Sequence, residues 1–223
     1  MDAADVLGSL AALSASVTTL AVLGWSGFWR LSRGLVGLAL ASALGEVLIL
    51  SNPATFWDPE LFLLWNCGLA LLGVIAALEL GHGVMRPAAF VWRMVCRRAA
   101  LVLVPLALIG VFGFVGLAGT QRVGYRGLFV LDMAVAGLLA IVLVAISLYE
   151  FPRHAMIVTA LRGLMCFFAM QALCLGSWEL GPLFARATGW LAYTSYVWVM
   201  LAVARDVLAT TSGPMLQTAR VAK

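Results

Sequence analysis

The sequence carries very little charge. Only 11% of its 223 residues are Asp, Glu, Lys or Arg, whereas soluble domains contain about 25%. Hydrophobic residues make up 64% of the chain, and the mean hydropathy is +1.05. A water-soluble core cannot absorb so much apolar surface, and helices that each need about 20 residues to cross a membrane leave only short connections. The composition therefore excludes a separate soluble catalytic or nucleic-acid-binding domain.

Lysine and histidine are scarce, which limits the cofactors that the chain can hold. The single lysine, Lys223, is the final residue, so no transmembrane lysine can form a Schiff base with retinal. The two histidines, His82 and His154, do not fall at facing depths in the membrane, which disfavours a bis-histidine haem. A P-loop, a His-Glu-x-x-His motif and a Gly-x-Ser-x-Gly motif are all missing. We therefore expect no cofactor and favour a non-enzymatic protein.

The sequence also lacks a Cys-x-x-Cys motif. Its four cysteines stand singly in or beside apolar segments, as small packing residues do: Cys67, Cys96, Cys166 and Cys174. Cys67 and Cys174 both fall in the outer half of the membrane in the topology below. One disulfide between them can form if their helices touch.

Seven uninterrupted apolar stretches account for most of the chain. They cover residues 6–29, 34–51, 60–82, 99–119, 127–149, 155–178 and 187–208. Backbone polar groups in lipid must be satisfied within their own segment, so each stretch is predicted to be a helix. Only Pro105 lies inside a stretch. The sequence thus predicts an all-α integral membrane protein, with one seven-helix domain over residues 1–208 and a short cytoplasmic tail over residues 209–223.

The basic residues predict the orientation of this bundle. Ten Arg and Lys residues fall in connections on one side of the membrane and three on the other. The richer side is cytoplasmic by the positive-inside rule, which places the N-terminus outside and the C-terminus in the cytoplasm. Residues 1–5 are acidic rather than basic, so we expect the first stretch to remain as a helix instead of being a cleaved signal peptide. We expect the inner membrane of a bacterium.

One connection is strongly basic. Residues 86–98 read RPAAFVWRMVCRR and contain Arg86, Arg93, Arg97 and Arg98. This segment is predicted to be an interfacial helix, or the wet start of the fourth helix, in contact with anionic lipid. The net charge of +4 is spread over helix ends rather than gathered in one patch, so we expect no nucleic-acid partner. Protein partners in a larger membrane complex stay open.

Small residues recur at every fourth position in the second and third stretches, a spacing that lets helices approach closely in lipid. They are Gly37, Ala41 and Gly45, and Gly73, Ala77 and Gly81. We therefore expect these two helices to pack tightly against each other.

Two weak echoes suggest an internal duplication. Residues 28–30 (FWR) close the first helix as residues 151–153 (FPR) close the fifth, an offset of 123. Trp65 and Trp190, near the starts of the third and seventh helices, are offset by 125. Together they favour a three-plus-one-plus-three arrangement with the fourth helix as a linker, as in some transporters.

Ionisable residues within the membrane are costly and mark the positions of interest. Glu79 and Arg162 fall at matching depths, and we expect them to form a buried ion pair. Asp132, near the outer start of the fifth helix, is expected to reach outward toward Arg122 or Arg126. Glu46 has no such exit, because its side chain leans toward the middle of the membrane. We expect it to be buried, protonated and hydrogen-bonded to Asn66 or Gln171.

The outer half of the membrane holds most of the other polar and aromatic side chains. If they converge, they form a ligand pocket that is open to the outside. The candidate ligand-binding residues are Glu46, Asn66, Asp132, Gln171, Trp178, Trp190, Tyr193, Thr194 and Tyr196.

A metal site is the other candidate. Glu79-x-x-His82 ends the third helix and Glu150-x-x-x-His154 joins the fifth and sixth. Two carboxylates and two imidazoles can bind zinc or iron, and Glu-x-x-His at helical spacing is typical of di-metal bundles. The alternative is that the histidines simply lie at the membrane interface.

Three functions follow from these patterns. The first is a non-enzymatic membrane module, either a receptor-like sensor or an accessory subunit, with a small-ligand pocket on the outer side. The second is a small-solute transporter or channel, for which Pro105 offers the only broken-helix signal. The third is a membrane-embedded metal-dependent enzyme.

Overall fold

The computed structural model describes residues 3–30, 32–56, 58–115, 121–149, 155–177 and 181–211, and every regular element within them is helical. The long helices are α1 (Ala3–Ser26), α2 (Arg33–Ser51), α4 (Pro59–Met85), α5 (Ala89–Val115), α6 (Gln121–Leu148), α7 (Ala155–Ser177) and α8 (Pro182–Thr211). The short elements are η1 (Phe28–Arg30), α3 (Pro53–Phe56) and η2 (Arg86–Ala88). The all-α class is therefore confirmed.

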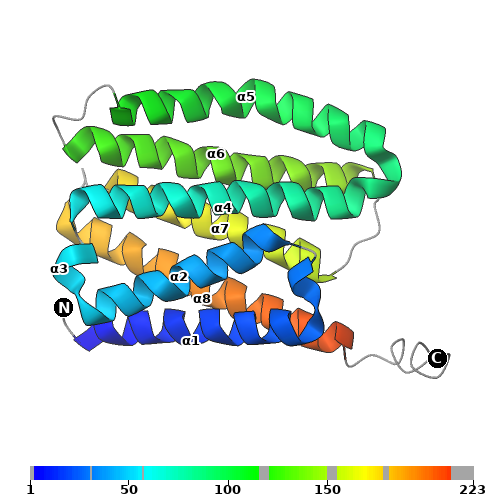
Figure 1. The fold of residues 1–223 in the computed structure, drawn as a ribbon. Coiled ribbons are helices and arrows are strands. Elements are labelled where there is room, and N and C mark those ends of the chain that lie inside the picture. Colours follow the sequence, from blue (N-terminus) through cyan, green and yellow to red (C-terminus); the bar gives the residue numbers. More distant parts are fainter. Residues whose placement is uncertain are drawn as a thin grey trace.

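The long helices run up and down in alternation and form a closed ring with one helix outside it (Figure 1). Around the ring, α1 packs on α2, α2 on α4, α4 on α6, α6 on α7, α7 on α8, and α8 on α1. The outlying helix, α5, packs mainly on α6. α1 begins at one end of the bundle and α8 finishes at the other.

Six stretches of the described helices are long and apolar enough to cross a membrane. One of them, Glu60–Leu101, has 42 residues and covers α4 together with the first half of α5. These two helices run in opposite directions (Figure 1), so they correspond to two of the seven stretches predicted from the sequence. The prediction placed the start of the fourth helix too late, because α5 begins at Ala89 rather than at residue 99. The basic segment 86–98 therefore forms η2 and the first turns of α5.

Local sequence sets several helix ends. The Ser32 hydroxyl accepts a hydrogen bond from the Leu35 backbone amide at 3.1 Å and caps α2. Asp58 caps α4 in the same way, and Pro59 occupies the first turn, where no amide hydrogen is needed. Gly27, with φ of +74°, ends α1 in a conformation that favours glycine.

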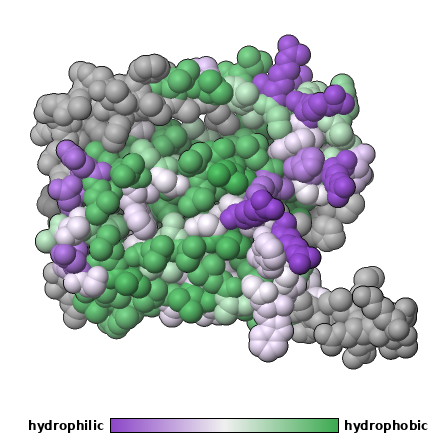
Figure 2. Space-filling view, viewed as in Figure 1, coloured by the Kyte–Doolittle hydropathy of each residue, from purple (hydrophilic) through white to green (hydrophobic). Residues whose placement is uncertain are grey.

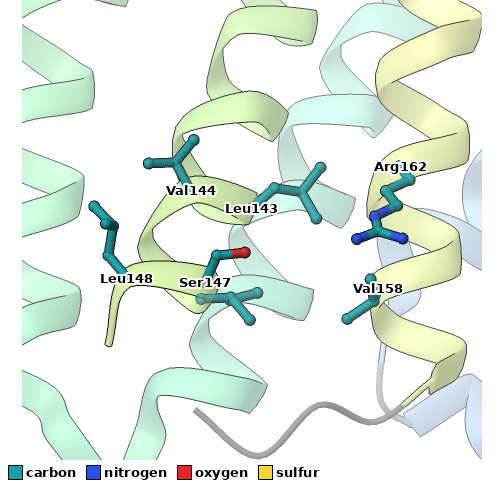
Figure 3. A pocket seen from close by; sticks show the side chains of 7 residues that line it. Leu143, Val144, Ser147, Leu148, Val158 and Arg162 are labelled. Atoms are coloured by element: carbon teal, nitrogen blue, oxygen red, sulfur yellow. The ribbon is translucent and has the colours of Figure 1, made fainter. Parts of the chain in front are cut away.

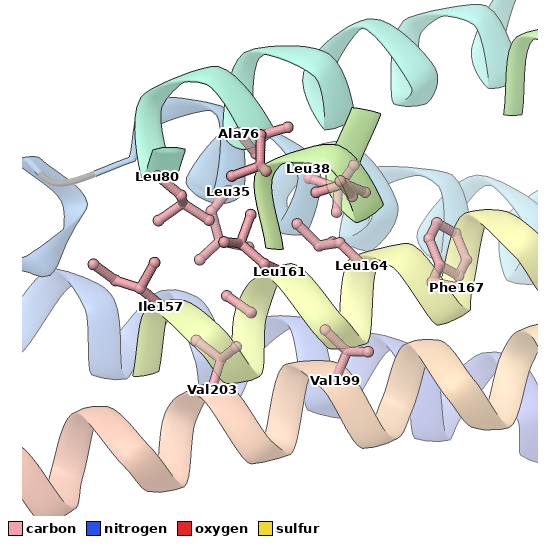
Figure 4. Close-up of a cluster of buried hydrophobic side chains, with 14 of the residues drawn as sticks. Leu35, Leu38, Ala76, Leu80, Ile157, Leu161, Leu164, Phe167, Val199 and Val203 are labelled. Carbon is pink, nitrogen blue, oxygen red and sulfur yellow. The ribbon is translucent and has the colours of Figure 1, made fainter. Parts of the chain in front are cut away.

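A cluster of buried apolar side chains lies between α2, α4, α7 and α8, toward the end of the bundle where α1 finishes (Figure 4). Leu35, Leu80, Leu161 and Val203 are each at most 1% exposed there. Gly34 permits the close approach of α2 to α4, because a Cβ atom at that position would lie 2.8 Å from the Cα of Ala76 in α4. The expected packing of α2 on α4 is thus present.

Gly73 and Gly81 of α4 were predicted to pack against α2, but they contact other helices. A Cβ at Gly73 would press on Phe168 of α7, and one at Gly81 would lie 2.7 Å from the Trp92 ring of α5. Cβ atoms at Gly73 and Gly81 would also lie 3.1 and 3.0 Å from Val135 and Val142 of α6. The stripe on α4 therefore faces α6, flanked by α5 and α7, while α2 packs on the neighbouring face at Ala76.

The outer surface matches helices that face lipid. Large apolar side chains are exposed along the helices, including Leu64, Leu71, Leu101 and Leu148 at 61–73%. Figure 2 shows a broad hydrophobic band across the middle of the molecule, with hydrophilic residues gathered toward its two ends. Patches of this extent are too large for the surface of a typical soluble monomer.

Candidate functional site

A cavity of about 620 Å³ lies inside the ring, in the half of the bundle where α1 begins. Its walls come from the first turns of α1, the last turns of α2, the first half of α4, the second half of α7 and the first half of α8, with Phe56 of α3 at one side. This volume is within the range of roughly 300–1,000 Å³ that small-molecule sites occupy.

Glu46 provides the carboxyl group on one wall. Its side chain is 8% exposed, and the phenol Oη of Tyr193 donates a hydrogen bond to its Oε2 at 3.4 Å. The Ser9 hydroxyl of α1 is a second hydrogen-bond partner. The preceding Gly45 lets the indole of Trp65 approach, since a Cβ there would lie 2.9 Å from its Nε1. Three helices thus hold this carboxyl group at the cavity surface.

Two amides face each other on the α4 and α7 side. The Gln171 Nε2 group donates to the Oδ1 of Asn66 at 2.5 Å, and Asn66 Nδ2 donates to the carbonyl of Phe62 at 2.7 Å. This pair joins two helices that otherwise touch little. An amide left unpaired in an apolar interior is costly, and this hydrogen bond gives each of the two amides a partner.

Beside the cavity, at Tyr196, α1 and α8 meet along a polar seam. The Tyr196 phenol and the Ser16 hydroxyl share a hydrogen bond of 2.7 Å, and the Thr19 hydroxyl donates to the carbonyl of Met200 at 2.9 Å. The ring of Phe167 lies 5.3 Å from that of Tyr196, between ring centroids. Polar groups along this seam are therefore paired with each other.

Aromatic rings form part of the remaining wall, together with aliphatic side chains and the charged residues Asp5 and Arg186. Phe56 contacts Phe62 and Trp65 edge to face, with centroid distances of 6.2 and 6.1 Å. Trp190 covers Gly8 of α1, where a Cβ would lie 3.3 Å from its ring. Such walls suit an apolar or aromatic ligand body, while Glu46 and the amides offer hydrogen bonds to its polar end.

The structure brings six of the predicted ligand-binding residues to this one cavity: Glu46, Asn66, Gln171, Trp190, Tyr193 and Tyr196. Thr194 is exposed on the outside of α8 and donates to the carbonyl of Leu191 at 3.1 Å. Trp178 lies outside the described residues. The predicted partners of Glu46 were wrong, because Asn66 and Gln171 bond to each other while Ser9 and Tyr193 reach Glu46. Whether these residues bind a ligand stays a prediction.

The other lining residues were not among the predicted candidates; they include the polar residues Ser9, Ser42, Asp5 and Arg186. A signal for Ser9 was available. Ser9, Ser16 and Thr19 are at most 2% exposed and share the inward face of an otherwise apolar α1. Polar residues at spacings of seven and three on such a helix indicate a face that meets polar partners.

Asp132 does not reach outward as predicted. It is 0% exposed, and neither carboxyl oxygen has a hydrogen-bond partner in the described part of the chain. It shares one face of α6 with Leu128, Val135 and Leu139, all at most 1% exposed. The expectation failed because this face turns into the bundle. Asp132 also lies outside the cavity lining.

The predicted pair of Glu79 and Arg162 is not formed among the described residues. Glu79 Oε2 instead accepts hydrogen bonds from the Gly34 amide at 2.8 Å and the Ser32 hydroxyl at 3.1 Å, at the start of α2. Arg162 is exposed and lines a smaller groove of about 220 Å³ between α6 and α7, beside Val158 and Ser147 (Figure 3). The start of α2 offers Glu79 unsatisfied backbone amides, which replace the guanidinium as its partner.

The metal hypothesis is only partly covered by the structure. Glu150 and His154 lie outside the described residues. His82 is exposed, with its ring 6.0 Å from that of Trp92, and Glu79 already accepts two hydrogen bonds. In the ranges that the structure describes, no three His, Cys, Asp or Glu residues gather as a metal site requires. Cys67 and Cys174 form no disulfide with each other.

The fold and the cavity together define a helical bundle with membrane-length helices and a ligand-sized, aromatic-walled chamber in one half. No protein family, curated protein or solved structure matches the chain. The geometry of the cavity is therefore the basis for a function.

Proposed function

We propose that this chain is a seven-helix integral membrane protein that binds a small, largely apolar molecule from the outer side of the membrane. It acts as a non-enzymatic, receptor-like module, working as a sensor or as an accessory subunit of a larger membrane complex. The observation that carries the proposal is the convergence of aromatic rings, two amides and Glu46 around one cavity of about 620 Å³.

The distribution of arginines supports the proposed orientation. Arg30, Arg33, Arg86, Arg93 and Arg205 all belong to helix ends at the end of the bundle opposite the cavity. Because basic connections stay in the cytoplasm, the cavity half faces outward. In a bacterium this places the protein in the inner membrane, with the arginines of segment 86–98 against anionic lipid.

The character of the lining supports a binding role over catalysis. Glu46 can accept a hydrogen bond or pair with a cationic group, and the Asn66–Gln171 pair can both donate and accept. The described residues bring no histidine to this cavity, and the Ser9 and Tyr193 hydroxyls are both hydrogen-bonded to Glu46. The ligand is therefore expected to have an apolar or aromatic body and one hydrogen-bonding head group.

The experiment is to compare what copurifies with the wild-type protein and with a cavity-filling variant. Ala192 is 9% exposed and lines the cavity, so Ala192→Phe should occupy the ligand's space. Ala21→Phe adds the same ring to an exposed position of α1 away from the cavity and serves as the matched control. Organic extracts of the three proteins are compared by liquid chromatography and mass spectrometry.

We expect a small molecule that is enriched with the wild type and with Ala21→Phe, and depleted at least tenfold with Ala192→Phe. Extracts that do not differ between the three folded proteins would contradict a ligand in this cavity. A stoichiometric protein partner in the same purification would identify the accessory-subunit form of the proposal.

A further inference from the structure

The six ring helices fall into two units with the same helix order and directions. In the first unit, α1, α2 and α4, and in the second, α6, α7 and α8, the middle helix runs opposite to its neighbours (Figure 1). The units meet along two seams, α4 on α6 and α8 on α1, and both seams join helices that run the same way. A half-turn about the bundle axis therefore exchanges one unit for the other. α5 lies outside this arrangement and carries the chain from one unit to the next.

Four of the six ring helices line the cavity at corresponding positions, whereas α1 lines it and no lining residue comes from the described part of α6. Three lining residues of α2 match three of α7 at an offset of 125, and lining residues of α4 match lining residues of α8 at an offset of 124. The pairs are Ser42 with Phe167, Glu46 with Gln171, and Ile49 with Cys174; then Phe62 with Arg186, Asn66 with Trp190, and Leu69 with Tyr193. These offsets lie within the 123–125 of the sequence similarities, although the offset of 124 pairs Trp190 with Asn66 rather than with Trp65. The cavity thus lies between two units of the same topology.

The two ends of this interface differ. The half with the cavity is hollow, whereas the opposite half is filled by side chains such as Leu35, Leu161 and Val203, each at most 1% exposed (Figure 4). A transporter in a state that is open to one side of the membrane is expected to have one half open and the other half closed. In transporters built from repeats, binding sites lie between the repeats near the midplane, and rocking of one repeat against the other exposes them to each side in turn.

We infer that the two three-helix units rock about the cavity and move its ligand across the membrane. The inference rests on the proposed ligand site and adds transport to it. The cargo is the class of molecule that the lining selects: a small, largely apolar solute with one hydrogen-bonding head group. Rocking separates the units at the packed end, around Leu161, and closes them at the cavity end, around Ala192.

The test measures access to these two positions from each side of the membrane. In a chain whose native cysteines are replaced by serine, Ala192→Cys and Leu161→Cys are made separately and reconstituted in vesicles of known orientation. The probe is a membrane-impermeant maleimide added to one side only, and the extent of labelling is read by mass spectrometry. Each variant is also made in a second background, in which Gly189→Phe at the cavity lining wedges the cavity end open.

Rocking predicts that Ala192→Cys is labelled from both sides and that Leu161→Cys is labelled from the cytoplasmic side only. The wedge at Gly189 should reduce labelling of Leu161→Cys at least fivefold, because it holds the opposite end closed. Labelling of Ala192→Cys from the outer side alone, with Leu161→Cys unreactive, would overturn transport while leaving the ligand site intact. Labelling of Leu161→Cys from the outer side would reveal a continuous channel and also overturn rocking. If Ala192→Cys reacts from neither side, the cavity is inaccessible and the proposed function itself fails.

Discussion

Glu46 is the residue on which the chemistry of the cavity depends most. Tyr193 and Ser9 both use its side chain as a partner. Glu46→Gln keeps an acceptor oxygen, so its stability should stay near that of the wild type. Glu46→Leu removes the acceptor and should lower the free energy of unfolding by about 1–2 kcal/mol, as for other hydrogen bonds between membrane helices.

Reversible unfolding in a mixed micelle, monitored by circular dichroism, measures both Glu46 variants. Equal damage from Gln and Leu would show that the position acts as a negative charge, and a cation would then be the better ligand.

Asp132 should behave in the opposite way. Neither carboxyl oxygen of Asp132 has a partner among the described residues, and a buried polar group left unpaired costs about 1–3 kcal/mol, so removing it should relieve a penalty rather than break a bond. We expect Asp132→Val to equal or exceed the wild type in stability, and Asp132→Asn to match it. The same unfolding assay decides this. A loss in both variants would mean that the carboxyl group holds a partner in the membrane.

At the level of helices, α2 and α4 approach each other closely at Gly34. A Cβ at Gly34 meets the backbone of Ala76, which cannot move aside as a side chain does. Gly34→Ala should therefore destabilise the protein by about 1–3 kcal/mol through overpacking. Gly68→Ala, on α4 with nothing within 4 Å of its Cβ, is the matched control and should gain up to about 1 kcal/mol from helix propensity. Thermal unfolding of both variants checks the contrast, and equal shifts would contradict the close packing.

The helices themselves were predictable because hydropathy and backbone satisfaction act within one segment. Which helices pack on one another was not predictable, because the direction in which a helix face points depends on the whole bundle. Asp132 illustrates this: its depth was readable from the sequence, but its rotation into the core was not. The site was predictable in part, since the outer-half polar residues had to find partners. Ser9 was predictable only together with Ser16 and Thr19, because the spacing of these three residues, and not one serine alone, marks the inward polar face of α1.

The whole molecule should be oriented with its cavity half outward. Alkaline phosphatase is active only outside the cytoplasm, and green fluorescent protein folds to its fluorescent form inside it. A phosphatase fused after Thr55, between α2 and α4, should be active, and a fluorescent protein fused after Ala88, between α4 and α5, should fluoresce. The positive-inside rule gives both expectations. The reverse pattern would place the cavity on the cytoplasmic side.

The position of α5 outside the ring bears on how such a chain could have arisen. A unit of three crossings ends on the opposite side from where it begins, so a second copy joined directly to it would be inserted upside down. One extra crossing restores the starting side, and the second copy then takes the same orientation as the first. A gene for a single three-helix ancestor that already paired with itself could therefore be duplicated and fused through α5 without altering the ancestral pairing surface. After such a duplication, α5 only connects the two units, and its sequence is expected to change faster than the sequences of the six ring helices.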